Sequence, residues 1–84
     1  MNDNEWYVAQ RLLEDDEAKV IDLFDNYELA EHACKLDHCK RGSIATDEYL
    51  IRHIKEVPGK KEPFVTEYHI IFISGQAVVT NQPY

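Results

Sequence analysis

The chain has 84 residues, of which 44% are hydrophobic, and its formal net charge is −7 at pH 7. This length predicts a single domain over residues 1–84, with one modest core. Three glycines and three prolines are too few for a low-complexity or disordered chain. The charge disfavours nucleic acid and anionic membrane as direct ligands, because phosphate groups require a positive surface.

The N-terminal stretch and the cysteines bear on the compartment. Residues 1–7, MNDNEWY, are polar and acidic, so no secretory signal is predicted, and no apolar run reaches the about 20 residues that span a membrane. Cys34 and Cys39 both fall in a predicted helix, where residues five apart lie about 8–9 Å from each other. A disulfide requires less than about 7 Å, so we expect two free thiols and a cytoplasmic location.

Two runs at the start predict a β-hairpin. Residues 5–13, EWYVAQRLL, and residues 18–24, AKVIDLF, are rich in aromatic and branched side chains, as in strands. The acidic loop 14–17, EDDE, joins them.

A helix is predicted directly after this hairpin. Asp25 is a candidate N-cap, and Glu28, three residues later, would complete a capping box. Phe24 and Leu29 fit a hydrophobic staple around that cap, and Gly42 is the expected stop. The helix is expected to pack through one narrow stripe of apolar residues. The stripe consists of Leu29, Ala30, Ala33 and Leu36.

Three further strands are predicted at 48–57, 64–74 and 77–80, with Pro58-Gly59 as a turn between the first two. The fold class is therefore α+β, an antiparallel sheet of four to five strands with one helix packed on it, in the order ββαβββ. Four consecutive apolar residues in the strand 64–74 indicate either a central strand or one that faces a partner, and they form a possible dimer strand. These are Ile70, Ile71, Phe72 and Ile73.

The string VIDLFDNYELAEHA at 20–33, followed after a polar gap by EYLI at 48–51, carries a resemblance. It resembles short uncharacterised proteins from bacteria and their phages, in which a hairpin leads into a strand-Phe-Asp-x-x-Glu-x-Ala helix start. The resemblance covers residues 18–54 and implies a fold class and a phage-like setting, but no catalytic residues.

The cysteines and histidines of the helix suggest two candidate sites, a zinc site and a cysteine nucleophile. His32, Cys34, His38 and Cys39 suggest zinc, yet only Cys34 and His38 share a face, so further ligands would have to come from His53 or His69. Cys34 and His38 could alternatively form a nucleophile pair, but no glycine-rich loop nearby would supply an oxyanion hole. We therefore expect no enzyme activity, metal or cofactor.

Basic residues in the second half offer a nucleic-acid alternative. Arg52, Lys55, Lys60 and Lys61 could interleave with Tyr49 and Tyr68 as stacking platforms. Glu56, Glu62 and Glu67 lie among them, so a mixed solvated surface is the simpler interpretation.

The uneven charge gives the functional hypothesis. Residues 1–37 hold eleven acidic and three basic residues, whereas residues 38–84 carry a net charge of +1. If the hairpin tip lies near the helix start, their carboxylates line one acidic edge that can imitate a phosphate chain. The edge comprises Glu14, Asp15, Asp16, Glu17, Asp22, Glu28 and Glu31.

We therefore expect a small acidic interaction module, a phage-encoded inhibitor that binds a basic, nucleic-acid-binding site on a larger protein. In size and charge the chain is similar to anti-CRISPR and other anti-defence inhibitors. The alternatives are a generic solvated surface, and a structural or regulatory homodimer without enzymatic activity.

Overall fold

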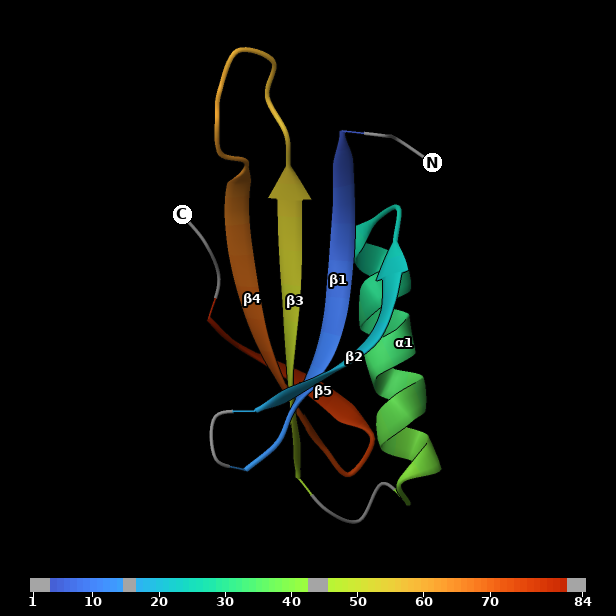
Figure 1. The fold of residues 1–84 in the computed structure, drawn as a ribbon. Coiled ribbons are helices and arrows are strands. Elements are labelled where there is room, and N and C mark those ends of the chain that lie inside the picture. The colour runs from blue at the N-terminus through green and yellow to red at the C-terminus, as the bar shows by residue number, and fades with distance from the viewer. Residues whose placement is uncertain (1–3, 15–16, 43–45, 82–84) are drawn as a thin grey trace.

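The computed structural model describes residues 4–14, 17–42 and 46–81, with side chains of the last strand up to Val78. It shows an α+β domain in which one helix packs on a five-stranded antiparallel sheet (Figure 1). In chain order the elements are β1 (Glu5–Leu12), β2 (Ala18–Phe24), α1 (Tyr27–Lys40), β3 (Asp47–Lys55), β4 (Phe64–Ile73) and β5 (Gln76–Asn81). In space the strand order is β2-β1-β3-β4-β5.

The expected class, with one helix and four to five strands, is confirmed, and each end of a predicted strand lies within two residues of the observed one. The apolar strand β4 is not the middle of the sheet, because β3 occupies that position. β4 still lies between two strands, and its side chains alternate between the sheet faces.

The helix begins one residue later than expected. Asn26, not Asp25, is the N-cap, and its Oδ1 accepts the backbone N–H of Leu29 at 2.9 Å. Glu28 is then the second helical residue, so the capping box is not formed. Both Asp and Asn can cap a helix. α1 packs on the sheet through one stripe of residues.

That stripe differs from the predicted one. Ala30, Cys34 and His38, spaced four apart, are buried, whereas Leu29 and Leu36 are 49% and 48% exposed. Leu29 therefore makes no staple with Phe24. Residues four apart share one helix face, and Ala and Cys are small enough to let α1 lie close to β1, β2 and β3.

The core lies between α1 and the sheet face that it covers. Its buried members from the strands are aromatic and branched, together with one small residue opposite the helix. They are Ala9, Tyr49, Ile51, Ile70 and Phe72. Because paired residues on neighbouring strands share a face, their alternate neighbours lie on the opposite side, which we call the open face.

The β4–β5 connection is a two-residue turn. Ile73 pairs with Gln76, and between them Ser74 and Gly75 have φ of 51° and 82°. Two positive φ values match the twist of a tight hairpin, and Gly is the residue that adopts them at least cost. The turn fixes the position of the Gly75 N–H, which donates a hydrogen bond to His38.

Within the part of the chain that the structure describes, no helix has both the length and the apolar character needed to cross a bilayer.

Candidate functional site

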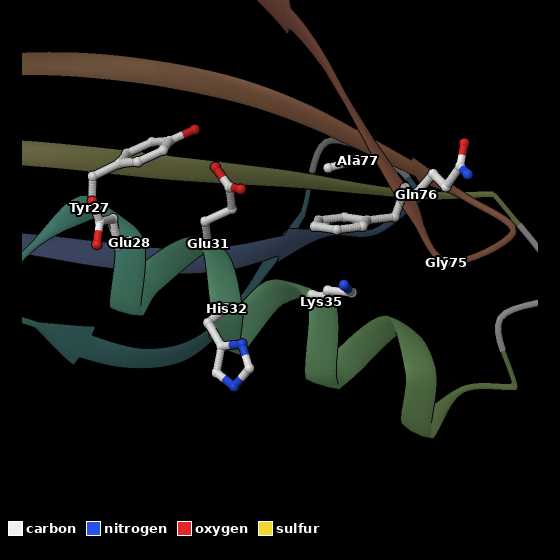
Figure 2. Close-up of a pocket in the computed structure, with 9 residues that line it drawn as sticks. Tyr27, Glu28, Glu31, His32, Lys35, Gly75, Gln76 and Ala77 are labelled. Atoms are coloured by element: carbon white, nitrogen blue, oxygen red, sulfur yellow. The ribbon is translucent and has the colours of Figure 1, made fainter.

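A cleft of about 700 Å³ lies between α1 and the β4–β5 hairpin (Figure 2). It exists because α1 packs mainly on β1, β2 and β3, and so leaves part of the β4–β5 side of the sheet uncovered. Residues on one side of α1 form one wall, and the hairpin forms the other. The lining residues are Tyr27, Glu28, Glu31, His32, Lys35, Phe72, Gly75, Gln76 and Ala77.

One end of the cleft combines aromatic rings with carboxylates. The ring of Tyr27 packs on Tyr68, with centroids 4.9 Å apart, and meets the edge of Tyr7 at 6.5 Å. Burial, together with the hydrogen bond and the charge of Glu31, raises the pKa of Tyr27. The hydroxyl therefore stays protonated and donates to Glu31. In Figure 2 the Glu31 carboxylate lies near the hydroxyl end of Tyr27 and the Glu28 side chain lies at its backbone end, a setting that suits a cation.

The other end is built on a buried histidine. The Nδ1 of His38 lies 2.7 Å from Oδ2 of Asp47, and the Gly75 N–H donates to its Nε2 at 3.1 Å. Because Nε2 accepts a hydrogen bond, the proton is on Nδ1 and is donated to Asp47. The imidazole also stacks on Phe72, with centroids 5.6 Å apart. His38 thus holds the hairpin wall of the cleft in place.

Asp47 is shared between His38 and a second donor. Arg41 donates from Nε to Oδ1 of Asp47 at 3.1 Å. Burial alone would raise the pKa of Asp47, but the hydrogen bonds from His38 and Arg41 outweigh it and lower that pKa below its ordinary value. The charged carboxylate therefore ties the end of α1 to the start of β3.

A second hydrogen-bond network surrounds Asp37. Its Oδ2 accepts from the Tyr49 hydroxyl at 2.6 Å and from the Arg11 guanidinium at 2.8 Å. Burial opposes ionisation, but these two bonds lower the pKa of Asp37 below its ordinary value. Burial and the bond to Asp37 raise the pKa of the fully buried Tyr49. α1 is thereby joined to β1 and β3 by charge-assisted bonds.

The predicted acidic edge is divided among three places. Glu28 and Glu31 line the cleft, whereas Asp22 borders a separate groove on the other side of α1. Glu14 and Glu17 flank the β1–β2 turn, and Asp15 and Asp16 lie outside the described residues. The seven residues of β2 separate that turn from the helix start by about 23 Å. Figure 1 shows β2 beginning at the bottom and ending beside the start of α1 at the upper right.

The possible dimer strand is divided between the two faces of the sheet. Ile70 and Phe72 are fully buried in the core under α1, and only Ile71 and Ile73 belong to the open face. Strand alternation explains the division. Two of the four residues are therefore not accessible to a partner.

Neither the zinc site nor the Cys34–His38 nucleophile pair is formed in the described part of the helix. Both thiols are free, with Cys34 buried and Cys39 exposed, and burial first, then Asp37 and Glu31, raises the pKa of Cys34 to about 12. His38 is fully buried, and its nitrogens are occupied by Asp47 and Gly75. Cys34 therefore has no base to activate it. No group of three or more metal-binding side chains occurs among the described residues.

Two of the basic residues of the β3–β4 hairpin have partners within the chain. Arg52 pairs with Glu67 at 2.8 Å on the exposed sheet surface, and Lys60 lies over the Phe64 ring, 5.6 Å from its centroid. Tyr49 is fully buried, so it cannot be a stacking platform for a base, and Tyr68 packs against Tyr27.

Sequence reasoning missed the polar networks, which involve Arg11, Asp37, Arg41 and Asp47. Their partners lie six to 26 residues away along the chain, so no local pattern reveals them. The four-residue spacing of Ala30, Cys34 and His38 was the one available signal, since it places the histidine on a buried stripe.

Comparison of the chain with protein-family models, with curated proteins and with solved structures found no match.

Proposed function

We propose that this protein is a small interaction module that binds a basic segment of a larger protein in the cleft between α1 and the β4–β5 hairpin. The observation that carries the proposal is the placement of Glu28 and Glu31 on the cleft wall beside Tyr27. A lysine or arginine side chain of the partner would lie along the aromatic surface and direct its charge to the two carboxylates.

The chemistry of this end favours a cation over a neutral group. A cation beside an aromatic face gains about 0.5–1 kcal/mol at an exposed site, and each exposed ion pair adds about 0.2–1 kcal/mol. The contributions are individually small, so selectivity requires several basic residues in the partner. Lys35 lies on the same wall, about two turns beyond Glu28 and one turn beyond Glu31 along α1. Its positive charge disfavours a basic residue of the partner at that position. The basic residues of the bound segment should therefore lie at the Tyr27 end of the cleft.

The overall charge supports the same partner. The chain carries −7, and the field of such a surface accelerates encounter with a basic protein at low salt. A basic segment that recognises nucleic acid offers the complementary charge. Occupation of that segment would compete with nucleic acid, which is how the module would inhibit a larger protein.

A labelled oligolysine peptide tests the proposal by fluorescence anisotropy. We expect binding that weakens as salt is added, because salt screens exposed charges. The Glu28→Gln/Glu31→Gln variant should bind about 2–30-fold more weakly, as expected for the loss of two ion pairs near the surface. Glutamine preserves the shape of each side chain, so the helix and the cleft are retained.

The matched control is Glu14→Gln/Glu17→Gln, which changes the net charge equally at the far end of β2. At about 0.1 M salt this variant should retain nearly all of the binding, because its carboxylates lie about 23 Å from the helix start that carries Glu28 and the Debye length is then about 10 Å. Equal weakening by both variants would show a general charge effect and would reject the cleft as the site. Absence of any oligolysine binding at low salt would reject the proposed partner class.

A further inference from the structure

The open face of the sheet carries many apolar side chains. Strand register places side chains from all five strands on it, and no described helix covers it. Several are large and about half exposed, such as Leu23, Val65 and Ile73. Its apolar members are Trp6, Val8, Leu12, Val20, Leu23, Leu50, Ile54, Val65, Ile71, Ile73 and Val78. A contiguous apolar surface of this kind marks an interface.

The charge of this face differs from that of the chain. Its charged residues in the strands are Glu48, Glu67 and Arg52, and the last two form a pair at 2.8 Å. The face is therefore almost neutral, although the chain carries −7. Two copies of so acidic a chain repel each other overall, and an almost neutral face adds little to that repulsion.

The size of the face matches what a stable dimer needs. The five strands contain eight, seven, nine, ten and six residues. At about 3.3 Å per residue and about 4.8 Å between strands, their footprint is about 600 Å². Two such faces together bury about 1,200 Å², if the sheet is treated as flat and the additional surface of protruding side chains is left out. This area reaches the lower bound of specific interfaces.

From these observations we infer that a second copy of the chain packs on the open face, sheet against sheet. In a two-fold symmetric dimer the open faces of the two copies contact each other. Arg52 and Glu67 of one copy can then pair with Glu67 and Arg52 of the other. Aligned sheets of this kind pack about 10 Å apart. Ile71 and Ile73 take part from β4, whereas Ile70 and Phe72 stay in the core of each copy.

The inference is independent of the proposed function. The cleft lies on the α1 side of the sheet, so the dimer would leave both clefts accessible. A partner with two basic segments could then occupy both clefts at once, which raises the overall affinity without any new contact.

Sedimentation velocity on the full chain at micromolar concentration tests the dimer. We expect a species of twice the 9.8 kDa chain mass. Ile73→Glu on the open face should weaken association by at least about tenfold, because it places a charge in the interface. Leu36→Glu on α1 is the matched control, since these two side chains are 47% and 48% exposed and neither belongs to the core. Circular dichroism confirms that both variants fold.

A wild-type chain that sediments as a monomer throughout the micromolar range would overturn the inference. So would a dimer that Leu36→Glu dissociates while Ile73→Glu does not, because the interface would then involve α1. Oligolysine binding is measured separately, so failure of the dimer and failure of the cleft give different results.

Discussion

His38 and Asp47 are joined by a hydrogen bond of 2.7 Å between two buried side chains. The bond connects the last turn of α1 to the first residue of β3, and the other ring nitrogen of His38 accepts from the Gly75 N–H. One side chain thus holds together the helix, the middle strand and the β4–β5 turn. The two walls of the cleft keep their separation because this histidine links them.

Replacement of this histidine tests its structural role. His38→Leu leaves Asp47 buried with only Arg41 as a partner and leaves the Gly75 N–H without its acceptor. We expect the free energy of unfolding to fall by about 3 kcal/mol. Urea denaturation measures it. His32→Leu, an exposed histidine on the same helix, should change stability by less than about 0.5 kcal/mol, and equal losses in both variants would contradict the role of His38.

The Tyr49 hydroxyl is expected to stabilise the fold through Asp37. Tyr49→Phe keeps the buried ring but removes a 2.6 Å hydrogen bond to a carboxylate. The expected loss is about 1.5–3 kcal/mol, as for bonds to charged groups. Tyr68→Phe removes the hydroxyl of a half-buried ring on the same sheet face and serves as control. If thermal or urea denaturation shows no difference between the two variants, the Asp37 network does not stabilise the fold.

Acid should destabilise the protein through Asp37 and Asp47. Their pKa values are lower in the folded chain than the ordinary value of 3.8, so the unfolded state takes up protons first as the pH falls. The stability that they confer is complete above pH about 4 and is lost below it, as the pH approaches the folded pKa values. Urea denaturation at a series of pH values measures this loss.

Asp47→Asn should reduce that acid dependence, because Asp37 is then the only one of the two carboxylates that titrates. Glu17→Gln, which alters an exposed carboxylate beside the β1–β2 turn, should leave it as in the wild type. A wild-type slope in Asp47→Asn would show that acid acts on other groups.

The thiols are expected to react in two classes. Cys39 is exposed, whereas Cys34 is buried and its pKa is raised to about 12, so little thiolate forms there. Titration with a disulfide reagent should detect one fast thiol per native chain and a second after unfolding. The native Cys39→Ser variant should show no fast thiol. Two fast thiols in the native wild type would contradict the burial of Cys34.

The secondary structure could be predicted because its signals are local. Alternation in residues 5–13 and branched residues in 18–24 determine strands wherever they lie in the chain. The helix start was ambiguous by one residue, because Asp25 and Asn26 are both competent caps. The stripe was predicted wrongly for another reason, because it was chosen by apolar character, whereas the buried positions are Ala30, Cys34 and His38.

The site depends on distances that the sequence does not contain. Glu14 and Glu28 lie in one acidic half of the chain, yet β2 holds them at opposite ends of the domain. Glu31 and Gln76 are 45 positions apart in the sequence, yet they line the same cleft. Pattern and charge therefore predicted the class of partner, whereas only the fold locates the surface that would bind it.

The most direct test of the central claim is an NMR titration of the isotope-labelled chain with oligolysine. We predict the largest amide shift changes at the cleft, in Glu28, Glu31, Gln76 and Ala77, with small changes at Glu14 and Glu17. Shifts that are confined to the β1–β2 turn, or spread evenly over all carboxylate-bearing segments, would contradict the proposal that the cleft between α1 and the β4–β5 hairpin binds the basic partner.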